Sequence, residues 1–278
     1  MKIEMAKSYG FCFGVKRAIK IAESAGEAAT IGELIHNAEE INRLKQNFGV
    51  KTLEGVSEIK DEQKLIIRTH GIQKDDLQRL KAQNKELIDA TCPFVTKPQQ
   101  IVEKMSAEGY DIVIFGDKNH PEVKGVKSYA KSRVFVIMDT KELQDVKLGP
   151  RVALVSQTTK KIESFTKIAD FLMQRARELR IFNTICNATL ENQEAVKSLS
   201  QKADVMIIVG GKNSSNTKQL FLISQNFCKD SYLIENESEL ERSWFENKSL
   251  CGISAGASTP DWIIKKVVAR IENLTQNL

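Results

Sequence analysis

The chain has 278 residues, 41% of them hydrophobic and 28% charged, with a formal net charge of +5. This is the composition of an ordinary globular protein, long enough for one large domain or for two or three small ones. It argues against a membrane protein, because no apolar run approaches the roughly 18 residues that span a bilayer, and against a nucleic-acid-binding arm, because the basic residues are not clustered.

The segment MKIEMAKSYGF at the start of the chain lacks the apolar core of a signal peptide, so we expect a cytoplasmic location. Five cysteines in a cytoplasmic chain are not expected to form a disulfide framework, which leaves metal binding, catalysis or simple burial. The mild positive charge suits a small anionic substrate. We expect neither a nucleic acid nor a membrane among the partners.

Three stretches of the chain share one layout. Each has a cysteine between a strand-like and a helix-like run, then a second apolar run ending in glycine, and a polar residue four positions later. The cysteine and the polar residue are 24, 28 and 28 residues apart. This regularity favours an internal repeat over chance similarity among ordinary βαβ units. The three sets are Cys12, Gly32 and His36; Cys92, Gly116 and His120; and Cys186, Gly210 and Ser214.

Later landmarks follow the same repeat. The second and third stretches share a G-x-K-N-x-x-x-x-K frame, in GDKNHPEVK (116–124) and GGKNSSNTK (210–218). Each stretch continues with an acidic–aliphatic pair and then with an apolar run that ends in hydroxyl- or histidine-bearing residues. The pairs are Glu58–Ile59, Glu142–Leu143 and Glu239–Leu240, and the runs are LIIRTHG (65–71), VALVSQTT (152–159) and LCGISAGAST (250–259).

Helical periodicity follows each cysteine, with Pro98 expected in the first turn of its helix. The β-branched runs Ile112–Phe115 and Val205–Val209 are typical of strands buried on both faces of a parallel sheet. We therefore predict an α/β protein of three similar doubly wound lobes in a pseudo-threefold, trefoil-like arrangement. The predicted lobes are residues 13–91, 92–185 and 186–278, the last completed by an N-terminal strand within residues 1–12.

Three of the cysteines are candidates for a metal centre. Ligands of α/β sheets bind beyond the carboxyl ends of the strands, where Cys12, Cys92 and Cys186 are all expected, so the three would meet at one centre. Three thiolates suit an iron–sulfur cluster with one iron left open as a Lewis acid. The alternatives are zinc, without an obvious Cys-x-x-Cys pair, and three buried structural cysteines. Cys228 and Cys251 lie outside the repeat positions and are expected in the core.

Hydrogen-bond donors gather at the same strand ends. All three histidines of the chain stand there, and imidazole can donate to phosphate oxygens. A Ser-Ser-Asn run is expected at a helix N-terminus, which favours anions; it could alternatively be a helix cap alone. The candidate anion-binding residues are His36, His70, His120, Thr158, Ser214, Ser215, Asn216 and Ser258.

Glu122 is the acidic residue in the conspicuous HPE loop. In a partly desolvated position its pKa would rise, which suits a proton donor. The alternative is a surface carboxylate paired with Lys124. Alignment of Glu122 with Asn216 in the repeat favours the proton-donor interpretation.

The motifs are similar to those of the 4-hydroxy-3-methylbut-2-enyl diphosphate reductase (IspH/LytB) family. They run in family order from residue 9 to residue 260, and GFC-x-GV, ATCP, HPEV-x-G and TIC-x-AT together are highly specific. The matching stretches are YGFCFGVKRA (9–18), LIHN (34–37), RTHG (68–71), DATCPFVTK (89–97), NHPEVKG (119–125), SQTT (156–159), NTICNAT (183–189), SSNT (214–217) and GISAGASTP (252–260).

The resemblance implies three lobes around a central [4Fe-4S] cluster, and the last step of the non-mevalonate (MEP) isoprenoid pathway. In that step two electrons and two protons remove an allylic hydroxyl, giving isopentenyl and dimethylallyl diphosphates. A reduced ferredoxin or flavodoxin is the implied electron donor. The resemblance further implies that Cys12, Cys92 and Cys186 are the cluster ligands and that Glu122 supplies protons. Thr158 would lie near the hydroxyl end of the substrate. The diphosphate would be held by His36, His70, His120, Ser214, Ser215, Asn216 and Ser258.

Three residues depart from the family pattern. Asn187 and Asn192 stand where the family usually has Tyr and Arg, and Glu33 replaces a smaller or cyclic residue. An alternative enzyme class, a [4Fe-4S]-dependent hydro-lyase on another small anionic substrate, would need no external electrons. A nucleic-acid or sensor module would show clustered basic residues and would not explain the His and Ser-Ser-Asn loops.

Overall fold

The strands of the protein form three parallel sheets. In the computed structural model residues 1–276 are described, and within them each sheet has four strands. Within each repeat the strands are numbered from the one that follows its cysteine, and the N-terminal strand counts as the fourth strand of the third repeat. Across each sheet the strands then lie in the order second, first, third, fourth, so the order reverses between the first and third strands. This topology confirms the predicted α/β class, and it places a switch point for ligand binding in every sheet.

The first sheet follows Cys12 and helix α1 (Phe13–Ala25). Its buried residues form one apolar cluster, in which Ile31 and Leu65 of the strands pack with Leu80 of the helix Lys74–Lys81. Its strands are β2 (Ala28–Ile31), β3 (Val50–Leu53), β4 (Lys64–Ile67) and β5 (Glu86–Asp89), with helices α2 (Ala38–Phe48) and α3 (Lys74–Lys81) and a 3₁₀ turn η1 (Val56–Glu58).

The second sheet follows Cys92 and helix α4 (Pro93–Ala107). Because Pro93 occupies the first helical position, Pro98 lies inside the helix, and the expected first-turn place for Pro98 was wrong. The strands are β6 (Asp111–Phe115), β7 (Val134–Ile137), β8 (Arg151–Ser156) and β9 (Glu178–Ile181), with helices α5 (Pro121–Ser128) and α6 (Ile162–Met173) and a 3₁₀ turn η2 (Thr140–Leu143).

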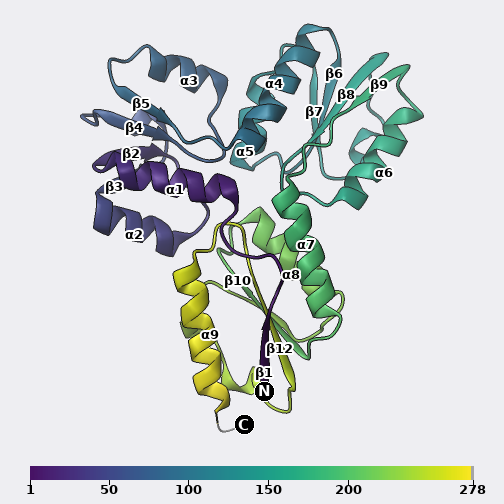
Figure 1. The fold of residues 1–278 in the computed structure, drawn as a ribbon. Helices are drawn as coiled ribbons and strands as arrows, with labels where there is room; N and C mark the ends of the chain where they lie inside the picture. Colours follow the sequence, from purple (N-terminus) through teal and green to yellow (C-terminus); the bar gives the residue numbers. More distant parts are fainter. Residues whose placement is uncertain (277–278) are drawn as a thin grey trace. The chain divides into compact units, whose positions relative to one another are not determined.

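The third sheet follows Cys186 and helix α7 (Asn187–Ser200), and the N-terminal strand β1 (Lys2–Met5) pairs with its third strand. Alternate residues of β10 pack on helix α9 and on helices α7 and α8, which lie on opposite sides of the sheet (Figure 1). The remaining elements are β10 (Val205–Val209), β11 (Ser231–Ile234), β12 (Leu250–Ala255), α8 (Ser215–Gln225), α9 (Asp261–Thr275), η3 (Glu237–Glu239) and η4 (Arg242–Phe245).

Equivalent hydrogen bonds occur in all three repeats. Each repeat glycine donates its N–H to the last residue of the second strand, and each repeat glutamate closes the next turn by accepting the N–H of the residue four positions earlier. The glycine bonds are Gly32–Leu53, Gly116–Ile137 and Gly210–Ile234, and the glutamate bonds are Glu58–Glu54, Glu142–Met138 and Glu239–Glu235. The sequence landmarks therefore mark equivalent turns.

The residues contact one another as two compact units. The first unit comprises residues 1–16, 36–42 and 187–278 and contains the third sheet. The second unit comprises residues 17–35 and 43–186 and contains the first and second sheets. The division into three lobes at residues 92 and 186 stays a prediction. Between residues 1 and 276, none of the helices is both long and apolar enough to cross a bilayer.

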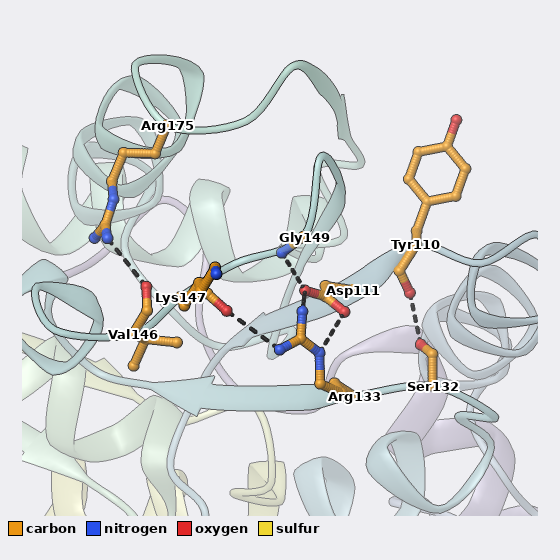
Figure 2. Close-up of polar contacts among 8 residues, drawn as sticks. All are labelled: Tyr110, Asp111, Ser132, Arg133, Val146, Lys147, Gly149 and Arg175. Carbon is orange, nitrogen blue, oxygen red and sulfur yellow. Dashed lines mark hydrogen bonds and ion pairs between the residues drawn. The ribbon is translucent and has the colours of Figure 1, made fainter.

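A polar network joins the amino ends of the strands in the second sheet (Figure 2). Arg133 donates to both carboxylate oxygens of Asp111, at 3.0 and 2.6 Å, and to the carbonyl of Lys147 at 3.2 Å. The N–H of Gly149 completes the set around Asp111 at 2.7 Å. These bonds lie at the strand ends opposite the switch point, which is typical of a stabilising role.

Candidate active site

The candidate residues follow the first and third strands of each sheet, where the strand order reverses. The loops after β2 and β4 carry His36 and His70, and those after β6 and β8 carry His120 and Thr158. The loops after β10 and β12 carry the Ser-Ser-Asn run and Ser258. The parallel strands therefore place these residues at the carboxyl edges of their sheets.

In the first unit, the N-terminus of α8 holds buried polar groups without partners. Ser214 caps the helix by accepting the N–H of Thr217 at 3.3 Å. The next side chains, Asn216 and Thr217, are 4% and 0% exposed, yet neither amide atom of Asn216 nor the Thr217 hydroxyl has a hydrogen-bond partner in the structure. Because burying an unpaired amide costs free energy, a ligand that paired with these groups would recover part of that cost.

His36 is held against this helix start through its backbone. The hydroxyl of Ser258 donates to the His36 carbonyl at 3.1 Å. A Cβ atom at Gly211 would lie 2.5 Å from the same carbonyl oxygen, so only glycine allows the two loops to approach this closely. The first unit therefore brings His36 and Ser258 to the loop that leads into Ser214, Ser215 and Asn216.

In the second unit, Glu122 and Thr158 form a buried pair. The N–H and the hydroxyl of Thr158 donate to the two carboxylate oxygens of Glu122, each at 2.7 Å. Glu122 is 1% exposed. The alternative of a surface carboxylate paired with Lys124 is therefore not the arrangement found, and the burial agrees with the expected desolvated carboxyl.

Burial raises the pKa of the Glu122 carboxyl, and the two Thr158 bonds and the charge of Lys160 offset part of that rise. Lys160 is itself buried, and burial lowers the pKa of its ammonium against the attraction of Asp117 and Glu122. The arrangement suits a carboxyl that can both bind and release a proton.

The two histidines of the second unit lie beside this pair. Nδ1 of His120 accepts the N–H of Glu122 at 3.2 Å, so the neutral His120 ring carries its proton on Nε2. The rings of His70 and His120 meet edge to face, with their centroids 5.3 Å apart. The structure thus groups His70, His120, Glu122 and Thr158 in one place.

The three repeat cysteines have equivalent backbone anchors. Each donates its N–H to the carbonyl two residues beyond the end of a third strand, in the bonds Cys12–Ala257 (3.1 Å), Cys92–Thr69 (3.0 Å) and Cys186–Thr158 (2.9 Å). None of the three is in a disulfide, and all three are partly exposed. Their thiols are therefore available as soft ligands that suit iron or zinc.

The other two cysteines are free and buried, as expected from the sequence. Burial raises the pKa of the Cys228 thiol and raises that of Cys251 to about 12. These thiols stay protonated at neutral pH and pack in the two apolar clusters of the third sheet.

Some residues around the site were not predicted from the sequence. Thr69 anchors Cys92 and donates its hydroxyl to the Leu34 carbonyl at 2.7 Å. It could have been found by aligning it with Thr158 in the repeat. Lys160 and Thr217 carried no such signal, because the importance of each comes from burial.

Comparisons with known proteins identify the family of the chain. The "LytB protein" family model matches residues 3–272. A curated 4-hydroxy-3-methylbut-2-enyl diphosphate reductase from Campylobacter hominis is 75% identical over 99% of this chain and 100% of its own length.

Two solved structures share the fold. One, titled as (E)-4-hydroxy-3-methyl-but-2-enyl diphosphate reductase, the terminal enzyme of the non-mevalonate pathway, is 43% identical, with a TM-score of 0.72 and coverage of 98% of this chain and 99% of its own. The other, an E-1-hydroxy-2-methyl-but-2-enyl-4-diphosphate reductase from Plasmodium falciparum, is 27% identical, with a TM-score of 0.92 and coverage of 99% and 89%. The chain belongs to the LytB protein family.

Proposed function

We propose that the protein is a 4-hydroxy-3-methylbut-2-enyl diphosphate reductase, an oxidoreductase of isoprenoid biosynthesis. The observation that carries the proposal is the 75% identity to a full-length relative of that name, with the family motifs at the strand ends. In the reaction the allylic C–O bond breaks, two electrons and two protons enter, and water leaves. The products are isopentenyl and dimethylallyl diphosphates.

The residues present fit a [4Fe-4S] cluster. Cys12, Cys92 and Cys186 are outside any disulfide, partly exposed and anchored alike, whereas Cys228 and Cys251 are buried with raised pKa values. We assign the first three as ligands, which leaves one iron open. When bound, such a cluster supplies the electrons and a Lewis acid for the substrate hydroxyl.

The diphosphate is assigned to the polar groups at the strand ends. The unpaired amide of Asn216 at the start of α8 supports this, because a diphosphate oxygen would satisfy its N–H donors. The full set proposed is His36, His70, His120, Ser214, Ser215, Asn216 and Ser258. Neutral His120 would donate from Nε2, since its Nδ1 is already an acceptor.

Glu122 is proposed as the catalytic proton source and Thr158 as its partner at the hydroxyl end of the substrate. The Thr158 hydroxyl donates to the carboxylate and can accept a proton in its place when the carboxyl is protonated. A proton can then pass from the Glu122 carboxyl to the Thr158 oxygen, 2.7 Å away, as the Thr158 hydroxyl gives its own proton to the leaving hydroxyl of the substrate. The raised pKa of Glu122 favours the protonated starting state.

We also propose an electron donor and a cellular location for the protein. A small one-electron carrier, a reduced ferredoxin or flavodoxin, would supply the two electrons in turn. None of the five cysteines is in a disulfide, which fits a reducing compartment, and we propose the cytoplasm.

An anaerobic assay tests the proposal. The protein, a low-potential reductant and 4-hydroxy-3-methylbut-2-enyl diphosphate should yield the two five-carbon diphosphates, with two electrons consumed per product. No product with a loaded cluster would overturn the substrate assignment. Turnover of a related anionic substrate without electron consumption would instead favour the hydro-lyase.

A further inference from the structure

The segment that leads into Cys92 is held by an arginine from another element. Arg17, on α1, donates from Nη1 to the carbonyl of Thr91 at 3.2 Å and from Nη2 to the carbonyl of Asp89 at 3.3 Å. Thr91 directly precedes Cys92, and its N–H is bound by the Asp89 carboxylate at 2.8 Å. With the Cys92 N–H on Thr69, the approach to Cys92 is fixed from two sides.

The segment that leads into Cys12 has a similar connection. The Ser8 hydroxyl donates to Oδ1 of Asn192, on α7, at 2.6 Å. Asn192 is 3% exposed, so loss of Ser8 would leave a buried amide oxygen without this partner. Asn192 is also one of the three departures from the family pattern, and the structure gives it a specific contact.

The two connections share one plan. In each, the helix that begins directly after one cysteine sends a polar side chain from its second turn to the segment before another cysteine. Arg17 stands five residues after Cys12, and Asn192 six residues after Cys186. In α4, after Cys92, the place that corresponds to Asn192 is taken by Pro98, which has no polar side chain, and the place that corresponds to Arg17 is taken by the exposed Lys97. Cys186 is instead anchored through Thr158 and Glu122.

We propose that Arg17 and the Ser8–Asn192 pair are positioning residues for the cysteines 92 and 12 respectively. They act by limiting the backbone motion of the segments that carry the thiols. A ligand loop that opens less often releases its metal less often. The proposal rests on the assignment of these cysteines as cluster ligands.

The Arg17 part is tested by the lifetime of the cluster. Arg17→Ala, Arg17→Lys and the control Lys20→Ala, an exposed position one turn further along α1, are prepared anaerobically with the cluster loaded. Decay of the visible absorbance is followed after adding an iron chelator. We expect Arg17→Ala to decay about threefold to tenfold faster, as for the loss of one or two hydrogen bonds. Arg17→Lys should be intermediate, because lysine lacks the two-pronged geometry.

A second measurement uses the protein without cluster. Amide hydrogen exchange in the peptide that contains Cys92 should be faster in Arg17→Ala, while exchange in β10 stays as in the wild type. This separates a local loosening of the cysteine segment from a general loss of stability.

The Ser8–Asn192 part is tested by a double-mutant cycle. Ser8→Ala and Asn192→Leu should each shorten the cluster lifetime, and the double variant should be no worse than the poorer single one. Ser8→Thr keeps the hydroxyl that donates to Asn192 without adding a charge and should retain the lifetime. Glu191→Ala, at an exposed neighbouring position, is the control.

The outcomes distinguish this inference from the proposed function. Unchanged lifetimes and unchanged amide exchange in Arg17→Ala, Ser8→Ala and Asn192→Leu would overturn the positioning roles and leave the reductase standing. A wild-type protein that holds no cluster under the same anaerobic loading would overturn the ligand assignment and this inference together.

Discussion

The carboxylate of Glu122 accepts both polar hydrogens of Thr158, and the Thr158 carbonyl accepts the N–H of Cys186. One residue therefore connects the proposed proton source with the backbone of a proposed cluster ligand. Replacement of Glu122 must be judged by turnover and by cluster content together.

Glu122→Gln should keep the fold and most of the cluster but lose turnover by about a hundredfold or more, as for the loss of a general acid. The glutamine carbonyl can still accept the Thr158 N–H, and the threonine hydroxyl can reverse its bond. Turnover with a chemical reductant, alongside iron content, is the measurement. Glu163→Gln, at an exposed position in the first turn of α6, is the control. Wild-type turnover in Glu122→Gln would remove the proton role.

The pH dependence of stability should also change in Glu122→Gln. Burial raises the pKa of Glu122 in the folded state, so its contribution to stability is fully present below the unfolded-state pKa and is lost as pH rises through the folded-state pKa. Relative to Glu122→Gln, the wild type should therefore lose stability with rising pH across that window. Urea unfolding of the two proteins from acidic to neutral pH checks this, and parallel curves would contradict it.

Lys160→Met tests how the neighbouring charge acts on Glu122. The lysine charge lowers the pKa of Glu122, so its removal should raise that pKa further. If protonated Glu122 is the active form, the fall of kcat/KM at high pH should move to higher pH. Lys160→Met in a Glu122→Gln background should leave the pH profile of kcat/KM unchanged. A shift of this fall in kcat/KM to lower pH in Lys160→Met would contradict the assignment of Glu122 as the proton source.

Asn216→Leu should separate stability from substrate binding. The buried amide has no hydrogen-bond partner within residues 1–276, so an apolar side chain of similar size should leave the free energy of unfolding unchanged or raise it by about 1 kcal/mol. The KM for the diphosphate should rise about tenfold or more, because an amide bond to a charged ligand is lost. Asn226→Leu, at the exposed end of α8, is the control. Destabilisation with an unchanged KM would mean that Asn216 is structural.

Arg133→Ala should destabilise the protein without changing turnover. It removes the two charge-assisted bonds to the largely buried Asp111 carboxylate, at a cost of about 1–2 kcal/mol after allowance for the exposed guanidinium (Figure 2). Lys147→Ala is a matched control, since Arg133 uses only the backbone carbonyl of that residue. Equal denaturant midpoints for both variants would contradict the stabilising role.

The repeat landmarks were the part of the fold that could be predicted. The glycines Gly32, Gly116 and Gly210 end buried strands, and Glu58, Glu142 and Glu239 close equivalent turns, because both roles depend on local backbone geometry. Strand order then follows from chain connectivity in parallel sheets.

Contacts between distant side chains could not be predicted in this way. The Glu122–Thr158 pair joins residues 36 positions apart, and the Ser8–Asn192 bond joins residues 184 apart. Neither leaves a periodic signal, because each depends on how loops pack once the sheets have formed. The place of Pro98 was missed for a different, local reason, since Pro93 was not recognised as the helix start.

The most direct test of the central claim is electron paramagnetic resonance of the anaerobically purified, reduced protein, recorded with and without 4-hydroxy-3-methylbut-2-enyl diphosphate. A cluster held by Cys12, Cys92 and Cys186 with an open iron predicts a cluster signal that changes when the diphosphate is added. A cluster signal unaffected by the diphosphate would contradict the substrate assignment, and a reduced protein without any cluster signal would contradict the metal centre itself.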